Sequence, residues 1–326
     1  MKKHTKNLIL ALVCFLIVLC LNFFLPRLLP GNPIAYLTGF SEEDMTPAQI
    51  TYYRQALHLD EPGFVQFGYY LRSLLDGSLG YSYKKEAAVS SLIAQRLGYT
   101  LQITLPAVLL STTIGLFWGL RSGYKKGSVG DQISTTFQIV VNTMPSFLIA
   151  LLLMILFCFR KRWFPYTGLN SGDVLPGSAA YWKDRVHHLV LPVLTLVIAA
   201  TPSRYLLMRN TASQITDAKY ILYAKERGLS DGTILFGYIL KNIAQPFITM
   251  VGMSVSTCIG GSIVIENIFS IGGMGSLLSE AVYTLDYPLM QGILFVTTGI
   301  MTLSIVMTDL LCILIDPRVR LGGGAA

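Results

Sequence analysis

Long stretches with few or no Asp, Glu, Lys or Arg residues divide this chain of 326 residues. A helix needs about 20 largely apolar residues to cross the roughly 30 Å hydrocarbon layer of a membrane. The stretches of about that length are residues 8–25, 100–120, 132–159, 189–208 (with Arg204), 243–265 and 287–315 (with Asp309). We therefore predict an all-α polytopic membrane protein with six transmembrane helices.

The composition excludes a water-soluble globule. Hydrophobic residues make up 52% of the chain and charged residues 13%, whereas about 25% of a typical soluble domain is charged. The net charge of +7 does not indicate nucleic-acid binding, because the basic residues lie between the apolar stretches and form no single patch. The five Cys residues lie in apolar stretches without paired spacing, so neither a disulfide framework nor a zinc site is predicted.

The basic residues also orient the chain, since Lys and Arg are enriched in the cytoplasmic segments of membrane proteins. They gather before the first stretch and in segments 121–131, 204–242 and 316–320, which lie on one side if six spans are counted. Both termini are therefore predicted to be cytoplasmic, although residues 160–162 place three bases on the other side. The first stretch could instead be a signal-peptide core, but it is long for one and no small-residue cleavage site follows it.

The segment between the first two spans, residues 26–98, carries helix signals and is predicted to fold outside the cell. Residues 46–49, Thr-Pro-Ala-Gln, form a capping-box pattern with proline at the first helical position. A second amphipathic helix is expected to begin near Gly63 and to stop at residues 76–77, Asp-Gly. The segment is either a cap on the outer membrane face or a docking surface for a partner that delivers substrate.

The inner segment between the fourth and fifth spans, residues 210–242, is longer than a packed connection needs. Asp217 is expected to cap its first helix, and Gly228 is expected to end that helix in the left-handed conformation. Ser230 is expected to cap a second helix. Two interpretations are open: a helix lying on the lipid headgroups, or a rigid helical elbow that transmits force from a partner.

The sequence lacks the phosphate-binding loop and two common hydrolase motifs. Residues 123–128 hold glycines and lysines in the wrong order for a phosphate-binding loop, so the chain is not expected to bind ATP. No H-E-x-x-H or G-x-S-x-G pattern occurs, and the adjacent His187 and His188 would point in different directions on a helix. We therefore predict no catalytic residue, no bound metal and no cofactor in this chain.

Charged residues are sparse within the predicted spans. Arg204 is expected to extend toward the lipid headgroups, and Asp309 to pair with a base or to cap a turn near the inner surface. Gly115 and Gly119 would allow two helices to approach closely. Other polar groups in the spans are costly unless they face water or a partner, so they could line a pathway. The candidate pathway residues are Asn142, Pro145, Glu266 and Asn267.

The most specific pattern is residues 220–230, Tyr-Ile-Leu-Tyr-Ala-Lys-Glu-Arg-Gly-Leu-Ser, followed by residues 240–242, Leu-Lys-Asn, and by Pro246. It resembles the EAA loop of the permease subunits of ABC importers of the dipeptide, oligopeptide and nickel class. In that class the loop docks into a cleft of the ATPase subunit. Leu222 and Tyr223 stand at the acidic and first alanine positions that name the loop.

Three further stretches resemble the same class, so the resemblance covers nearly the whole chain. They are residues 57–82, residues 266–288 and residues 316–320, Asp-Pro-Arg-Val-Arg. Within the second stretch, residues 271–272, Ile-Gly, stand where the class usually has Trp-Pro or a similar pair. Residues 322–326 fall beyond the resemblance.

The resemblance implies a type I ABC importer permease fold and a place in a bacterial inner or plasma membrane, surrounded by lipid. It implies that a second homologous permease completes a heterodimer and that two ATPase subunits bind ATP and Mg²⁺. It also implies an extracellular binding protein that delivers the substrate. The residues implied to couple this chain to the ATPases are Tyr223, Ala224, Lys225, Gly228, Leu229 and Ser230.

The expected organisation has four parts: a cytoplasmic N-terminus with the first span (1–25), an extracellular helical segment (26–98), a five-helix core (99–315) with a coupling loop (210–242), and a cytoplasmic tail (316–326). The substrate is expected to be a peptide or, within the same class, nickel or a metal chelate. Outside that class, the alternatives are a stand-alone channel or secondary carrier, and a membrane enzyme.

Overall fold

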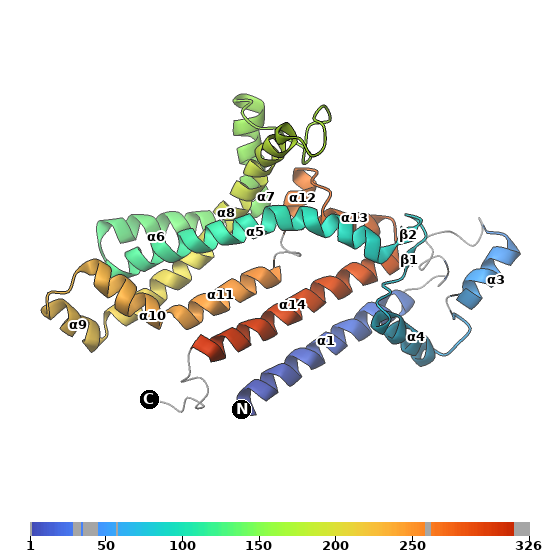
Figure 1. Ribbon diagram of the computed structural model, residues 1–326, viewed down its shortest axis with the longest axis horizontal. Coiled ribbons are helices and arrows are strands. Elements are labelled where there is room, and N and C mark those ends of the chain that lie inside the picture. The colour runs from blue at the N-terminus through green and yellow to red at the C-terminus, as the bar shows by residue number, and fades with distance from the viewer. Residues whose placement is uncertain (1, 29–33, 35–44, 57, 258–261, 316–326) are drawn as a thin grey trace.

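A computed structural model describes residues 2–28, 34, 45–56, 58–257 and 262–315, and this part of the chain is mostly helical (Figure 1). The predicted tail, residues 316–326, lies outside the described residues. The elements before the long core are α1 (Lys2–Leu28), α3 (Pro47–Ala56), α4 (Gly63–Leu75), β1 (Tyr81–Ser82) and β2 (Ala87–Ala88). The core elements are α5 (Val89–Tyr124), α6 (Val129–Asn142), α7 (Ser146–Leu153), η2 (Met154–Arg160), α8 (Ala179–Thr216), α9 (Lys219–Glu226), η3 (Thr233–Ile239), α10 (Leu240–Asn242), α11 (Ala244–Thr257), α12 (Ile263–Ile268), α13 (Met274–Tyr283) and α14 (Tyr287–Ile315).

The long helices α5 and α8 form the central pair of the molecule, and α14 packs between α11 and α1 (Figure 1). The antiparallel hairpin of β1 and β2 lies beside the start of α5, near α4 and the end of α1 (Figure 1). Helix α9 lies at the opposite end of the molecule (Figure 1). The two long polar segments of the sequence are therefore found at opposite ends of the helix bundle.

Three described helices are long and apolar enough to cross a membrane: α5, α8 and the Tyr287–Cys312 part of α14. Two further candidate spans are bent pairs of helices: α6 with the α7–η2 helix, which covers the predicted span 132–159, and the η3–α10 helix, which precedes the predicted span 243–265, with α11. The axis turns by 97° between α6 and the helix that follows it, and by 63° between α10 and α11. Counting each bent pair as one span gives five, and α1 contains a shorter apolar helix, Ile9–Phe24. The polytopic helical fold is confirmed, with three to five candidate spans among the described residues, and the predicted span 132–159 is bent.

Prolines lie at both bends. Pro145 has no N–H and disfavours helical geometry in the residue before it, so α6 ends before it and α7 begins after it. Pro246 lacks the N–H that would bond to the carbonyl four residues earlier, in α10. Within the predicted span 243–265, α11 covers Ala244–Thr257 and α12 begins at Ile263, and residues 258–261 between them lie outside the described part of the chain.

The two helices predicted in the outer segment are both present. The N–H of Thr46 donates to the Gln49 side chain at 2.8 Å, and the N–H of Gln49 donates to Thr46 Oγ1 at 3.4 Å, so the capping box is formed. Pro47 is the first residue of α3. Helix α4 ends before Asp76, and Gly77 follows with a φ of +77°.

The contact between α5 and α8 depends on glycines on one face of α5. A β-carbon at Gly119 would lie 2.6 Å from the carbonyl oxygen of Tyr205, and one at Gly123 would lie 2.4 Å from that of Arg209. Gly115 is similarly close to the α8 backbone. The close approach expected at Gly115 and Gly119 is confirmed, and Gly123 extends it by another turn toward the end of α5.

We predict that Gly119→Ala destabilises the protein, because the added methyl group overlaps the α8 backbone. Overpacking of this kind typically costs about 1–3 kcal/mol. Gly98→Ala, in the same helix, is the matched control: nothing lies within 4 Å of a β-carbon there, so alanine should stabilise the helix by about 0.5–1 kcal/mol. Thermal unfolding in detergent measures both effects. Equal melting temperatures for the two variants would contradict the proposed packing.

Candidate functional site

The connection between α8 and α11 is a helical elbow, residues 218–243, built from α9, η3 and α10. Gly228 lies at its turn with a φ of +72°. The N–H of Gly228 donates to the Lys225 carbonyl at 2.9 Å, and the N–H of Leu229 donates to the Ala224 carbonyl at 3.2 Å. This pair of bonds is the Schellman motif, in which a left-handed residue ends a helix. The predicted left-handed Gly228 is therefore confirmed.

The caps of the elbow agree with the sequence at one of two positions. The N–H of Thr233 donates to Ser230 Oγ at 3.3 Å, so Ser230 caps the second helix as predicted. The prediction for Asp217 is wrong, because Ala218 precedes α9 and no side chain caps that helix. Asp217 instead follows α8 and pairs with Lys126 at 3.0 Å. The carboxylate that was expected to cap α9 is thus paired with the ammonium group of Lys126.

One face of the elbow packs against the core and the other is exposed. Ile221 and Ala224 belong to a buried cluster with Met208 of α8. Ala224, implied by the resemblance to contact an ATPase, is only 4% exposed, and its small side chain lets α9 lie close to the core. Of the other implied coupling residues, Leu229 is half-buried against the same cluster. The exposed ones are Tyr223, Lys225, Gly228 and Ser230.

The elbow is bound to the turn between α5 and α6. The hydroxyl of Tyr124 donates to Asp231 at 2.7 Å, and the ammonium group of Lys225 lies 4.9 Å from the centre of the Tyr124 ring. The ion pair of Lys126 with Asp217 also ties the turn to the residue that directly precedes the elbow. A displacement of the elbow must therefore move the α5–α6 turn or break these contacts.

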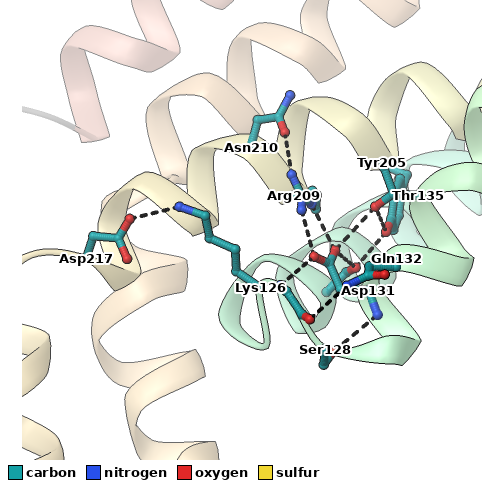
Figure 2. A network of polar contacts seen from close by, with 11 residues as sticks. Lys126, Ser128, Asp131, Gln132, Thr135, Tyr205, Arg209, Asn210 and Asp217 are labelled. Carbon is teal, nitrogen blue, oxygen red and sulfur yellow. Dashed lines mark hydrogen bonds and ion pairs between the residues drawn. The ribbon is translucent and has the colours of Figure 1, made fainter.

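Behind this turn, Asp131 of α6 and Arg209 of α8 form a bidentate ion pair (Figure 2). Arg209 donates to the two carboxylate oxygens at 2.9 Å and 2.6 Å. The Ser122 hydroxyl and the Gly127 N–H donate to the same carboxylate at 2.6 Å and 2.9 Å. The hydroxyl of Tyr205 lies 2.6 Å from Ser122 Oγ. This cluster, called here the Asp131 network, joins α5, α6 and α8.

Sequence reasoning missed the Asp131 network and treated Arg209 only as a cytoplasmic charge. A local signal for Asp131 was available. Ser128 precedes α6 and an acidic residue follows three positions later, as in a capping box. In the structure, the N–H of Asp131 donates to Ser128 Oγ at 3.2 Å. No comparable signal identifies Arg209 as its partner, because 78 residues separate them.

We predict a strong energetic coupling between Asp131 and Arg209. Asp131 is 3% exposed, and breaking a buried charge pair leaves a desolvated group behind. A double-mutant cycle with Asp131→Asn and Arg209→Gln should give a coupling of about 1–3 kcal/mol in detergent unfolding. The exposed pair of Lys126 and Asp217 at the same end is the matched control and should give less than about 1 kcal/mol. Comparable values for both pairs would show that the Asp131 network is not stabilising.

The candidate pathway residue Glu266 lies in α12 and is fully buried. The hydroxyls of Thr100 and Ser262 each donate to one carboxylate oxygen at 2.7 Å. The N–H groups of Gly275 and Ser276, at the start of α13, donate to the other oxygen at 2.8 Å and 3.1 Å. A carboxylate is favoured at a helix N-terminus. Glu266 therefore holds α5, α12 and α13 together.

The other three candidate pathway residues are exposed. Asn142 is the last residue of α6 and Pro145 precedes α7, so both lie at the 97° bend. Asn267 donates to the Ser279 hydroxyl at 3.1 Å. Helix α7 packs against α12, which carries Glu266 and Asn267. Their role in a transport pathway stays a prediction.

We predict that Glu266→Ala destabilises the α12–α13 region, because several buried donors lose their acceptor. Each unsatisfied buried group costs about 1–3 kcal/mol, so the melting temperature in detergent should fall and amide exchange in residues 274–283 should rise. Glu280→Ala is the control. Glu280 is half-exposed and pairs with Lys85, so its loss should cost less than about 1 kcal/mol. Unchanged amide exchange in residues 274–283 of the Glu266→Ala variant would contradict the conclusion that Glu266 holds these helices together.

Within the described part of the chain, no group of three or more His, Cys, Asp or Glu residues could hold a metal ion. The two adjacent histidines make separate contacts. His187 lies 2.8 Å from the Trp163 carbonyl oxygen, and His188 lies 2.9 Å from the Asp184 carbonyl oxygen.

Comparison with known proteins identifies the kind of membrane protein. Residues 111–321 match the family described as binding-protein-dependent transport system inner membrane component. Residues 3–104 match the N-terminal part of such membrane components. Together the two matches cover most of the chain.

Relatives of the chain match it along nearly their whole length. A probable peptide ABC transporter permease protein of Sinorhizobium fredii is 32% identical over 301 residues, covering 91% of this chain and 92% of the relative. A putative peptide permease protein of Brucella ovis is 32% identical, with coverages of 96% and 97%. A dipeptide transport system permease protein of Alkalihalophilus pseudofirmus is 29% identical, with coverages of 97% and 98%. The chain belongs to the family of binding-protein-dependent transport system inner membrane components, the membrane permeases of ABC importers.

Proposed function

We propose that this chain forms half of the translocation pathway of an ATP-driven importer of peptides. The observation that carries the proposal is the elbow, whose turn is fixed by Gly228 and whose exposed face is available to a partner. The relatives described as peptide and dipeptide permeases favour a peptide over nickel or a metal chelate. A stand-alone channel or secondary carrier would have no need of such an elbow.

In the proposed topology, α1, the bent pair of α6 and α7, and helix α11 complete six spans, and both termini are cytoplasmic. The elbow then faces the cytoplasm of a bacterial cell, and α3 and α4 lie outside. The basic residues of the elbow end support this orientation. They are Lys125, Lys126, Lys219, Lys225 and Arg227.

The proposed assembly contains a second homologous permease, two ATPase subunits and an extracellular binding protein. ATP and Mg²⁺ are bound by the ATPases, since this sequence has no phosphate-binding loop. Exposed apolar side chains along α6 would face lipid or the second permease. They include Ile133, Phe137 and Val140.

The contacts of the elbow suggest how ATP-driven motion reaches the membrane. If the ATPases displace α9, its buried side chains pull on α8, and Tyr124 and Lys126 pull on the α5–α6 turn. The Asp131 network holds α6 and α8 together at that point. Rigid coupling of this kind lets one cytoplasmic movement change the arrangement of several spans.

We predict that Gly228→Val abolishes coupling while membrane insertion is preserved. A side chain at φ +72° costs at least about 1 kcal/mol, and a branched one costs more. Gly232→Val is the matched control, because Gly232 lies in the same elbow with a φ of −62° and open space around its β-carbon position. Peptide uptake into reconstituted vesicles should fall at least about fivefold in Gly228→Val and much less in Gly232→Val.

Copurification of the ATPases with each variant shows whether the lost uptake comes from weakened docking. Wild-type uptake and normal ATPase association in Gly228→Val would refute the coupling role of the elbow. Equal losses in both variants would attribute the effect to side-chain bulk and not to backbone conformation.

A further inference from the structure

A cavity of about 640 Å³ lies between α8 and α11 in the membrane-spanning part of the chain. Sites for small molecules typically have volumes of about 300–1,000 Å³. Its lining includes polar side chains from both helices and flexible apolar ones from α11. Among the described residues that line it, Arg204 carries the one formal charge.

The sequence analysis predicted that Arg204 extends toward the lipid headgroups. The structure shows a different contact. Arg204 is 8% exposed, and its Nη2 donates to Ser254 Oγ of α11 at 2.9 Å. Ser254 in turn donates to the Met250 carbonyl at 2.8 Å, so this bridge lies across the wall of the cavity. A cation held inside a membrane span is costly, and such residues mark substrate pathways.

The remaining lining suits a peptide. The amide of Gln245 and the hydroxyl of Thr249 offer hydrogen-bonding groups for peptide N–H and C=O groups. Met250 and Met253 are flexible apolar side chains, which adapt to ligands of differing shape. A guanidinium group binds a carboxylate more specifically than an ammonium group does, because its fork matches both oxygens.

We propose that this cavity is a cargo site in which Arg204 binds the C-terminal carboxylate of the transported peptide. The proposal rests on the peptide import proposed above and assigns a residue to substrate recognition within the permease itself. A free divalent metal ion would be repelled by Arg204. A site for lipid phosphate groups is usually built from several basic residues, whereas the described part of the lining has one.

The position of Arg204 also connects the cavity to the elbow. The next residue, Tyr205, belongs to the Asp131 network, and Met208 one turn later packs against the buried face of the elbow. Movement of the elbow is therefore transmitted along α8 directly to the cavity wall. A cargo site at this place would change its shape with each ATPase cycle.

The test uses the complete complex, with binding protein and ATPases, in vesicles and with radiolabelled alanine peptides from dialanine upward. Arg204→Gln should reduce uptake at least tenfold while ATP hydrolysis stimulated by the loaded binding protein continues. Arg204→Lys should recover part of the uptake, because the charge is retained. Arg121→Gln is the matched control, since Arg121 is an exposed arginine at the cytoplasmic end of α5.

Ser254→Ala separates cargo binding from helix bridging. If Arg204 acts only by joining α8 to α11, Ser254→Ala should reduce uptake as much as Arg204→Gln does. The proposal predicts a smaller loss in Ser254→Ala, because the cation stays in the cavity. Equal losses in the two variants would overturn it.

A second measurement does not depend on the folding of an Arg204 variant. Met253 is 64% exposed and lines the cavity, so Met253→Cys in a cysteine-free background should react with a maleimide. Dialanine should slow this labelling, and dialanine amide, which lacks the carboxylate, should not. If anionic lipid alone slows the labelling, or if the cysteine does not react because the second permease covers it, the proposed cargo site is wrong.

The outcomes distinguish this inference from the function on which it rests. If the wild-type complex imports none of the alanine peptides, the proposed peptide transport fails. If it imports them and Arg204→Gln does so equally well, only the assignment of Arg204 fails.

Discussion

Backbone contact between α5 and α8 is the constraint on which the functional end of this permease depends. Glycines at 115, 119 and 123 leave no space for a side chain between the two helices. This contact fixes their relative rotation, and therefore brings Ser122 of α5 next to Tyr205 of α8. Asp131 can then reach Arg209 and Ser122 together. The close contact of α5 and α8 therefore positions the charged and hydroxyl groups of the Asp131 network.

Signals that act within a few residues were readable from the sequence. The capping box at Thr46 and the turn at Gly228 are decided by local hydrogen bonds and by the conformational freedom of glycine. The partners of Asp131 and Glu266 could not be read in this way. Their distant partners, Arg209 and Thr100, lie 78 and 166 residues away, and whether such residues meet depends on the rotation of whole helices.

Hydropathy located the apolar stretches but not their geometry. A run without charges is long enough to span a membrane whether or not a proline bends it, so the 97° turn near Pro145 was not predicted. The direction of Arg204 was also misjudged. A long side chain can reach the headgroups only if no nearer partner accepts its hydrogen bonds. Ser254, on a helix that follows a bend, provides that partner.

A proline inside α8 affects how this helix would respond to a force applied at the elbow. Pro202 lies inside the helix, two residues before Arg204. It removes one hydrogen bond of the helix and makes bending easier at that point. The part of α8 after Pro202 holds the cavity arginine and Arg209, and it ends at the elbow. In the proposed mechanism, a force applied at the elbow would act on a segment that is held by the Asp131 network, and α8 would bend most easily near Pro202, so Arg204 would move together with the elbow.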